Sequence, residues 1–503
     1  MSIFLLTFYP ANGFNFFIVM ATLNEIAENW KLEAKQEDNT RYFFHVNEAE
    51  KVLKGEKFYV IGRKGSGKSA ISQYILNQCK TNLLSGYNTF AEQLSFKNFP
   101  FNELYGLQNG KYTKPNQYIT IWKYIIYSCI CKLMSKNQNI DAELRTSFLE
   151  KLYPETSIKS LSRLIDNWVT KGFGAQIVGT GGNIEIDRIS KFENLSWIEK
   201  TNILEDVIDK YIDDSSYYII FDELDEDYRD FETDEERSQY VYLITSLFKA
   251  VQDIKSVFRD KKQIVSPIVF LRDDIYLLIK DTDKNKWSDF KISIEWDEEK
   301  LKSMLAHRIS RAIDSEGSIL SFKDAWNHIF TEEEVEFGDR QKKRISSFNY
   351  ITRSTQLRPR DYIRYLQVCA EKAIENGNTK ITPNIIKRVD KGFSNYLKEE
   401  IIDEIHAQLP DIHVIFSIIS QIRKQIFSIE EFKNTYKTYY DKGTVHNPNV
   451  DYVLQVLFDF SVIGNMHKNG RISFFRYINS DARFNFNEKI VVHRGLFKAL
   501  QIL

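Results

Sequence analysis

Cysteine is scarce in this sequence, and its few cysteines are not spaced as a metal site requires. The four cysteines among 503 residues are Cys79, Cys129, Cys131 and Cys369. None forms a CxxC pair, and no histidine stands at zinc-finger spacing from them. Cys129 and Cys131 fall in an apolar stretch that predicts a helix, so we expect buried free thiols. This pattern argues against a disulfide framework and fits a reducing cytoplasm.

An excess of positive charge is also missing. The chain has 68 Lys and Arg residues against 69 Asp and Glu, a net charge of −1. It therefore lacks the broad positive field of a dedicated nucleic-acid-binding protein, although a local basic patch is compatible with these totals. Hydrophobic residues make up 43% of the chain and aromatic residues 14%, which excludes a mostly disordered chain.

The first twenty residues contain no charged side chain. Residues 1–20 lack the basic start of a signal peptide, and Pro10 and Gly13 interrupt the apolar run. We expect a poorly structured leader, or sequence upstream of a start at Met20, rather than a membrane anchor. The protein is therefore predicted to be cytoplasmic and not bound to a membrane.

The length of the chain predicts several domains, and three regions separate by pattern. Residues 21–298 alternate apolar runs with helical periodicity, the pattern of an α/β domain with a mostly parallel sheet. Apolar residues recur at helical spacing in residues 299–400, which predicts a helical lid domain. Residues 401–503 predict three helices followed by two strands, which is the element order of a winged helix.

Particular elements can be placed within these regions. The expected strands of the first region are 58–61, 217–221 and 268–271, with helices at 69–79 and 118–134 and a hairpin-like piece at 172–186. The expected lid helices include 301–313 and 361–374. The expected winged-helix elements are helices at 414–422, 429–439 and 452–460, a strand at 471–477 and a final run at 489–500.

One segment has the glycine and lysine spacing of a phosphate-binding loop. It matches G-x-x-x-x-G-K-[ST] and continues into Ala70, with the residues Gly62, Arg63, Lys64, Gly65, Ser66, Gly67, Lys68 and Ser69. The glycines let backbone N–H groups surround a phosphate, and the helix that follows adds its positive N-terminal end. Lys68 neutralises phosphate oxygens, and the Ser69 hydroxyl is placed to bind Mg²⁺. Because the loop joins a predicted strand to a predicted helix, we predict bound ATP and Mg²⁺ rather than a surface turn.

Two carboxylates follow the second expected strand. Asp222 and Glu223 come directly after residues 217–221, at the carboxyl end of a buried strand, where ligands bind in such sheets. We predict that Asp222 holds the metal through its water shell and that Glu223 orients or deprotonates the attacking water. The alternative is a helix N-cap. The next acidic residues, including Asp225, are expected to form a solvated loop or a cap.

Three arginines are considered as candidates for sensing the nucleotide. Arg272 directly follows the third expected strand, from which a cation would reach toward a γ-phosphate; the alternative is a surface arginine paired with Asp273 or Asp274. Arg358 and Arg360 stand just before a lid helix, where a basic residue could couple the lid to nucleotide occupancy. We favour Arg360 over Arg358 as the nucleotide contact; the alternative is an ordinary role at the start of the helix.

These motifs together resemble the AAA+/STAND group of P-loop ATPases. The sequence is similar to bacterial single-chain P-loop ATPases that carry a GRKGSGKSA loop, an FDELDE-type acidic motif and an FLRDDI strand end. The resemblance covers about residues 40–503 and includes QLRPRD at 356–361 and VHRGL at 492–496. It implies that the nucleotide domain, the lid and the winged helix form one switch module with ATPase activity.

The resemblance also assigns roles to individual residues. Arg272 then looks like a sensor-1 arginine and Arg360 like a sensor-2 residue. His493 resembles a winged-helix histidine that contacts ADP in related immune ATPases, but Arg494 replaces the aspartate of that motif, so a core or surface histidine is favoured. Homo-oligomers are common in this group, and Arg308 and Arg311 are candidates for an arginine that completes a neighbour's site.

Two classes of function follow. In the first, the protein is a nucleotide-controlled switch or assembly ATPase that acts on a protein partner or effector, for example in bacterial antiphage defence. In the second, it is an origin-recognition-like ATPase that binds DNA through its winged helix. The first is favoured, because acidic residues on the third predicted winged-helix helix would repel DNA phosphates. Those residues are Asp451 and Asp459, whereas Arg471 and Arg476 of the wing could contact DNA.

Overall fold

The computed structural model describes residues 11–81, 88–95, 116–150, 197–225, 228, 233–261, 264–338, 343–468, 470 and 472–502. The hairpin expected at 172–186 and the wing residue Arg471 lie outside these described residues. The chain divides into two compact units. The sheet unit comprises His45–Arg63 and Lys68–Ile294, and the helical unit comprises Met1–Phe44, Lys64–Gly67 and Glu295–Leu503.

The sheet unit is built on five parallel strands in the order β2-β3-β4-β1-β5. Their bounds are β1 Tyr59–Gly62, β2 Thr89–Ser95, β3 Ser216–Asp222, β4 Val265–Arg272 and β5 Lys291–Ser293. The three strands expected from sequence are β1, β3 and β4, and all three are confirmed. β3 and β4 are buried along nearly their whole length because helices cover both faces of the sheet.

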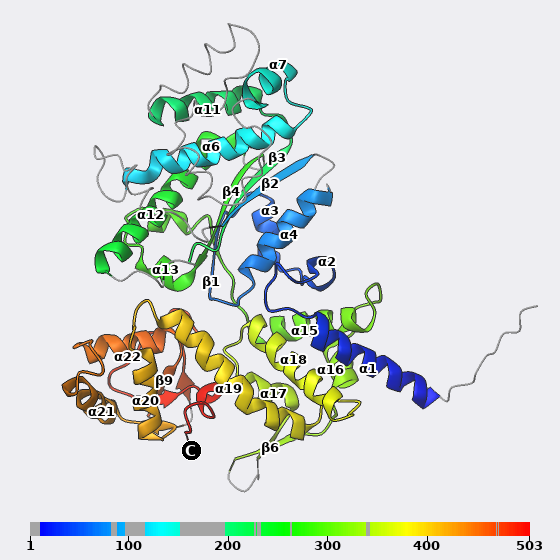
Figure 1. Cartoon of the computed structure of the whole chain (residues 1–503), viewed down its shortest axis with the longest axis vertical. Helices are drawn as coiled ribbons and strands as arrows, with labels where there is room; N and C mark the ends of the chain where they lie inside the picture. The colour runs from blue at the N-terminus through cyan, green and yellow to red at the C-terminus, as the bar shows by residue number, and fades with distance from the viewer. Residues whose placement is uncertain are drawn as a thin grey trace, which may run out of the picture. The chain divides into compact units, whose positions relative to one another are not determined.

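Helices pack on the sheet from two sides (Figure 1). α6 and α12 lie on one side, where Trp122 of α6 meets Phe221 of β3 edge-on and Phe248 of α12 stacks on Tyr59 of β1. α4 lies on the other side and buries Ile71 and Ile75. The helices of the sheet unit are α3 Asn47–Leu53, α4 Lys68–Thr81, α6 Ile119–Lys136, α7 Ala142–Leu144, α11 Trp197–Tyr211, α12 Asp234–Val257, α13 Asp273–Leu278 and α14 Lys284–Trp287. Shorter helical turns occupy Asn116–Tyr118, Arg145–Leu149 and Arg259–Lys261.

The helical unit contains the expected lid and an N-terminal helix that packs with it. The lid elements are α15 Glu298–Ile313, α16 Phe322–Ile329, β6 Val335–Phe337, β7 Lys343–Ile345, α17 Ser347–Thr352, α18 Pro359–Glu375 and α19 Pro383–Ile405. α15 and α18 contain the two lid helices expected from sequence. The N-terminal elements are α1 Ala11–Asn29 and α2 Asn39–Tyr42.

The N-terminal segment differs from the sequence-based expectation in two ways. Residues 11–20 belong to α1 rather than to an unstructured leader. Residues 21–44 group with the lid and not with the sheet unit, because Leu23, Ile26 and Trp30 are fully buried in the core that α1 shares with α15 and α18. No helix in the described part of the chain is long and apolar enough to cross a membrane.

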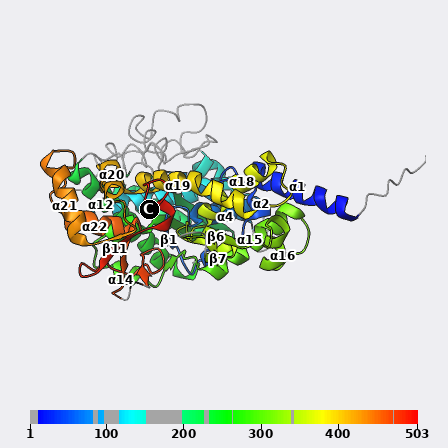
Figure 2. The same cartoon turned by 90° about the horizontal axis from the view of Figure 1, so that it is seen from below.

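The C-terminal elements have the order of a winged helix. They are α20 Ile412–Ile422, β8 Ile426–Phe427, α21 Ile429–Asp441, α22 Val450–Asp459, β9 Ile463–Met466, β10 Ser473–Phe474 and β11 Lys489–Val492, followed by a helical turn at Arg494–Leu496. The strands form an antiparallel sheet in the order β10-β9-β11-β8. The three predicted helices are confirmed, and the final predicted run consists of β11 and the helical turn. α19 leads from the lid into α20 (Figure 2).

The lid and the winged helix are joined at the VHRGL segment. His493 is buried, its Nδ1 accepts a hydrogen bond from the Gly495 N–H, and its Nε2 lies 3.2 Å from the carbonyl oxygen of Thr355 in the lid. Arg494 pairs with Asp390 of α19 at 3.1 Å. These contacts explain why the lid and the winged helix form one unit, where the sequence predicted two domains.

Candidate functional site

The predicted phosphate loop lies at the carboxyl end of β1 and opens α4. Gly65 has a φ of +76° and Gly67 a φ of +99°, conformations that side chains other than glycine rarely adopt. Lys68 is the first residue of α4, so the positive end of the helix begins where the motif places its lysine. The local sequence therefore produces the strand, loop and helix that phosphate binding requires.

Lys68 folds back onto its own loop. Its Nζ donates hydrogen bonds to the carbonyl oxygens of Gly62 at 2.8 Å and Arg63 at 3.0 Å. Burial lowers the pKa of Lys68, and the nearby carboxylate of Asp225 acts in the opposite direction. Among the described residues, this buried ammonium group donates its hydrogen bonds to neutral carbonyls, which suits an anionic ligand.

Further features of the loop fit a phosphate group. The hydroxyl of Ser66 is buried and has no hydrogen-bond partner among the described residues. A Cβ atom built on Gly67 would meet no atom of the described residues within 4 Å, its chain neighbours aside. The loop thus combines an unsatisfied polar group, open space beside its backbone and a lysine, and the residues present fit a nucleotide phosphate.

Ser69 and the acidic pair come together at the same edge of the sheet. Ser69 Oγ lies 3.5 Å from Asp222 Oδ1, and the N–H of Glu223 donates to that oxygen at 2.9 Å. Asp222 is buried, and Glu223 has a φ of +57°, which is uncommon for a residue with a side chain. A hydroxyl and a carboxylate at this distance are oxygen donors of the kind that Mg²⁺ takes.

The edge strand β2 supplies two side chains that sequence reasoning missed. Ser95 Oγ donates to Glu223 Oε2 at 2.6 Å, and Gln93 Nε2 donates to Asp222 Oδ2 at 3.2 Å. Ser95 is in register with Asp222 in the parallel pairing of β2 and β3. Residues 93 and 95 lie on the same face of the strand, but only the pairing of β2 with β3 reveals that they hold the acidic pair.

Arg272 ends β4, and two carboxylates hold it. Its Nε and Nη2 contact the two carboxylate oxygens of Asp274 at 3.0 and 2.8 Å, and Nη1 lies 3.3 Å from Asp225. Arg272 is buried, so the alternative of a surface arginine is wrong about its exposure. The pairing with Asp274 that this alternative predicted is confirmed. Asp225 also differs from expectation, since it pairs with Arg272 rather than only facing solvent. Burial raises the pKa of Asp225, but Arg272 and Lys68 outweigh this and hold it below its usual value.

The tip of the loop, Lys64–Gly67, belongs to the helical unit and contacts lid residues there. Trp296 Nε1 donates to the carbonyl oxygen of Ser66 at 2.8 Å. The N–H of Arg360 lies 3.5 Å from the carbonyl oxygen of Gly65, and a methyl group on Gly65 would lie 3.1 Å from Arg360 Cβ. Glycine at this position therefore admits the first turn of α18.

The two lid arginines have different environments. Arg358 is fully buried, with contacts to Asp361 at 3.0 Å and Glu404 at 2.7 Å. Burial acts against its charge, but these carboxylates outweigh it and raise the pKa of Arg358. Arg360 is a quarter exposed and lies 3.3 Å from Glu400. Arg358 is thus fixed inside the lid, and Arg360 remains the better candidate for a nucleotide contact.

Three other candidates have structural roles. His493 is buried and hydrogen-bonded at both ring nitrogens, as the core interpretation predicts. Arg308 is buried against Glu37, with its guanidinium over the Trp30 ring. Arg311 donates to backbone carbonyls of the turn that follows α15.

Of the two wing arginines expected to contact DNA, Arg476 lies among the described residues and does not face solvent. Arg476 is buried, and its guanidinium donates to the carbonyl oxygens of Asp459 at 3.1 Å and Ser480 at 3.4 Å. It therefore caps α22 and does not project from the wing. Asp451, in the first turn of α22, pairs with Lys433 at 2.6 Å.

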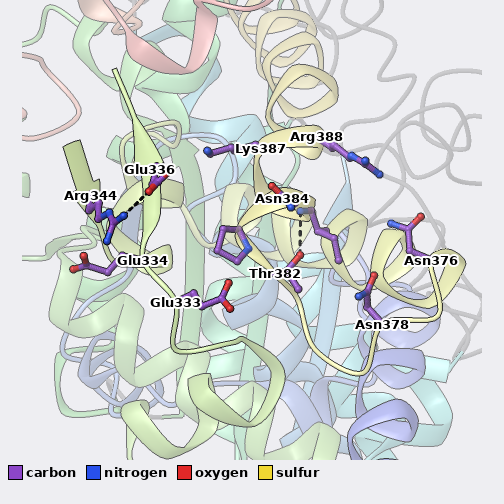
Figure 3. A pocket seen from close by; sticks show the side chains of 12 residues that line it. Glu333, Glu334, Glu336, Arg344, Asn376, Asn378, Thr382, Asn384, Lys387 and Arg388 are labelled. Carbon is purple, nitrogen blue, oxygen red and sulfur yellow. Dashed lines mark hydrogen bonds and ion pairs between the residues drawn. The ribbon is translucent and has the colours of Figure 1, made fainter. Parts of the chain in front are cut away.

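A polar hollow lies elsewhere in the lid, between the β6–β7 hairpin and the start of α19 (Figure 3). Glu336 and Arg344 pair across the hairpin at 2.7 Å, and Lys387 and Arg388 line the hollow from α19. None of the predicted site residues lines this hollow, so it is separate from the phosphate loop.

Comparison with known proteins gives one family match and several similar structures. A model of the FunZ-associated C-terminal helical domain matches residues 299–402, from α15 into α19. No curated protein matches the chain.

Three solved structures are similar over most of the chain at low identity. The structure of Drosophila ORC bound to DNA is 10% identical, with 100% of this chain and 96% of that chain covered and a TM-score of 0.29. The Aeropyrum pernix ORC2 protein, in ADPNP and ADP complexes, is 11% identical, with 94% and 93% covered and a TM-score of 0.30. Cdc6p from Pyrobaculum aerophilum is 10% identical, with 90% and 91% covered and a TM-score of 0.30.

Proposed function

We propose that the protein is an ATPase of the P-loop class that acts as a nucleotide-controlled switch. ATP and Mg²⁺ bind at Gly62–Ser69, and hydrolysis changes the contacts between the loop tip and the lid. The lid transmits this change to the winged helix, which passes it to a partner.

The observation that carries the proposal is the segment Gln356–Asp361. At one end, Gln356 Nε2 donates to the carbonyl oxygen of Phe460, at the end of α22 in the winged helix, at 3.2 Å. At the other end, Arg358 Nη1 and the Arg360 N–H lie 3.5 Å from the carbonyl oxygens of Lys64 and Gly65 respectively. Six consecutive residues therefore contact both the phosphate loop and the winged helix, as a switch requires.

Each residue of the site then has a role that follows from its chemistry. Bound Mg²⁺ would polarise the phosphoryl oxygens that ATP presents. Lys68 neutralises phosphate charge, Ser69 and Asp222 hold the metal, and Glu223 accepts a proton from the attacking water. Ser95 fixes the orientation of the Glu223 carboxylate through their hydrogen bond. Arg272 and Arg360 respond to the γ-phosphate.

The proposed partner of the switch is a protein. Copies of this chain are also proposed to associate with one another. The winged helix is fixed to the lid, and its helix α22 carries acidic side chains, a surface better suited to protein than to DNA phosphates. Nucleotide-dependent assembly of several copies would be one output of the switch. A setting in antiphage defence would require that Lys68→Ala abolishes protection in a phage-plating assay.

DNA binding by the winged helix is the second candidate, because the order and pairing of α20–β11 are those of a DNA-binding module. The burial of Arg476 counts against it. Duplex DNA binding with a steep dependence on salt would support this candidate instead.

Nucleotide binding is tested by Lys68→Ala, with Lys80→Ala later in the same helix as a matched control. Equilibrium binding of ATP, measured by calorimetry, should be lost in Lys68→Ala because the phosphates lose their main side-chain cation. The control should bind as the unmodified protein does. Equal ATP affinity in Lys68→Ala and the control would contradict the proposed site.

A further inference from the structure

The last two turns of α19 carry acidic residues where a helix least favours them. Glu399, Glu400, Asp403 and Glu404 all lie within six residues of the end of the helix at Ile405, and its last turn has no basic residue. The carbonyl groups at a helix C-terminus give that end a partial negative charge, which repels carboxylates. Such a departure from local preference indicates that these carboxylates serve contacts elsewhere.

Three of these carboxylates face the lid arginines and the tip of the phosphate loop. Glu400 Oε2 lies 3.3 Å from Arg360 Nη1 and 3.5 Å from Lys64 Nζ. Asp403 is 3.9 Å from the same lysine. The spacing of positions 400, 403 and 404 places the three side chains on one face of the helix. All of these contacts lie within the helical unit.

Glu400 differs from the neighbouring glutamates in the residues that it contacts. Glu404 pairs at 2.7 Å with Arg358, a buried residue fixed inside the lid. Glu399 is exposed and pairs at 3.0 Å with the adjacent Lys398. Glu400 contacts both Lys64 of the phosphate loop and Arg360, the favoured nucleotide-sensing arginine, with only 18% of its side chain exposed.

We propose that Glu400 is a positioning residue that competes with nucleotide phosphate for Arg360 and Lys64. The proposal rests on the proposed ATP-binding function. A carboxylate and a phosphate offer a guanidinium the same kind of charged acceptor, so Arg360 cannot bind both fully. Nucleotide therefore has to displace Glu400, and the apparent affinity of the site is reduced by the stability of the Glu400 contacts.

The position of Glu400 gives this competition a consequence for the winged helix. α19 ends at Ile405, and α20, the first helix of the winged helix, begins at Ile412. Release of Glu400 leaves repelling carboxylates at the end of α19 without two of their cations. The occupancy of the phosphate loop is thereby linked to the segment that joins the lid to the winged helix.

The test compares Glu400→Gln with the matched control Glu399→Gln in the full chain. The glutamine keeps the shape of the side chain and removes its charge. We expect the Kd for ATP to fall about threefold to tenfold in Glu400→Gln, since a partly buried ion pair no longer opposes binding, and to stay unchanged in the control. In an Arg360→Ala background the gain should shrink to about twofold or less, because the main contested cation is gone.

The outcomes separate this inference from the proposed function. If the unmodified protein binds ATP and Glu400→Gln binds it equally or more weakly while remaining folded, the inference is overturned and the proposed function stands. If the unmodified protein binds ATP no better than Lys68→Ala, both are overturned. Should Glu400→Gln fail to fold, Glu400→Asp withdraws the carboxylate by one methylene and should tighten ATP binding in the same direction, and its failure to do so overturns the inference.

Discussion

At the scale of single residues, the catalytic assignment depends on Glu223. Its backbone is in the left-handed region, and its carboxylate accepts a hydrogen bond from Ser95. A strained conformation of this kind persists only where the surroundings hold it, and such residues cluster at functional sites. The structure therefore gives Glu223 a fixed orientation at the end of β3, which a general base requires.

Glu223→Gln should abolish turnover and preserve binding. The amide cannot accept the proton of the attacking water, so we expect kcat for ATP hydrolysis to fall by about 10²- to 10⁴-fold. The Kd for ATP should change little, because Lys68 and the loop backbone are intact. Steady-state phosphate release and calorimetry measure the two quantities, with the exposed Glu235→Gln in α12 as the control. Persistent turnover would move the general-base role to another residue.

Ser69→Ala should weaken Mg²⁺ binding at the site. The hydroxyl lies 3.5 Å from Asp222, and its loss leaves the metal without one protein oxygen. We expect the Mg²⁺ concentration for half-maximal hydrolysis to rise about tenfold or more. Loss of a residue that only hydrogen-bonds to a metal ligand can already weaken metal binding by this factor. Ser69→Thr keeps the hydroxyl and should restore the metal dependence of the unmodified protein. An unchanged Mg²⁺ requirement in Ser69→Ala would remove Ser69 from the metal site.

The positions of the candidate site residues could be predicted from sequence where the motif is local. The loop Gly62–Ser69 and the pair Asp222 and Glu223 follow from short motifs placed at strand ends. Ser95 and the pairing of Asp225 with Arg272 could not be predicted, because they depend on which strands are neighbours in the sheet. Contacts such as Arg308 with Glu37, separated by 271 positions, carry no local pattern at all.

At the scale of elements, the helical unit depends on contacts between segments far apart in the chain. The N-terminal helix α1 belongs to the lid core, although its sequence predicted an unstructured leader followed by part of the α/β domain. The apolar residues of α1 do not by themselves indicate which other helices they pack against. Helix positions such as α15, α18 and α22 were predictable because hydrophobic periodicity is a property of the segment itself.

Leu23→Ala should destabilise the helical unit. Leu23 is fully buried in the core shared by α1, α15 and α18, and its truncation leaves a cavity. We expect a loss of about 2–5 kcal/mol in the free energy of unfolding, measured by denaturant titration. The neighbouring Asn24→Ala, at an exposed position, should change it by less than about 0.5 kcal/mol. Equal stability of the two variants would contradict the packing of α1 on the lid.

Two glycines of the helical unit should respond to alanine in opposite directions. A methyl group on Gly495 would lie 2.2 Å from the carbonyl oxygen of Ser354 and 2.5 Å from Leu397, so Gly495→Ala should cost about 1–3 kcal/mol or more by overpacking. A methyl group added at Gly392, inside α19, would meet no described atom within 4 Å beyond the backbone of its own helix, and Gly392→Ala should stabilise by up to about 1 kcal/mol. Thermal unfolding of both variants measures the contrast. A tolerated Gly495→Ala would show that the junction between lid and winged helix is looser than described.

At the scale of the whole molecule, the proposed switch joins nucleotide chemistry to a module that would receive its signal. Gln356–Asp361 contacts the loop tip and the winged helix, and His493 and Arg494 fix the winged helix to the lid. The sequence predicted the three regions and their order. It did not predict that lid and winged helix form one unit, because that depends on close packing at Gly495.

The most direct test of the switch is hydrogen exchange in Glu223→Gln protein saturated with ATP or with ADP. We predict different exchange between the two nucleotides in the last turns of α19 and in Arg494–Leu496. The difference should disappear in a Lys68→Ala background. Identical exchange in these segments, with both nucleotides shown to be bound, would contradict the claim that the nucleotide controls the winged helix.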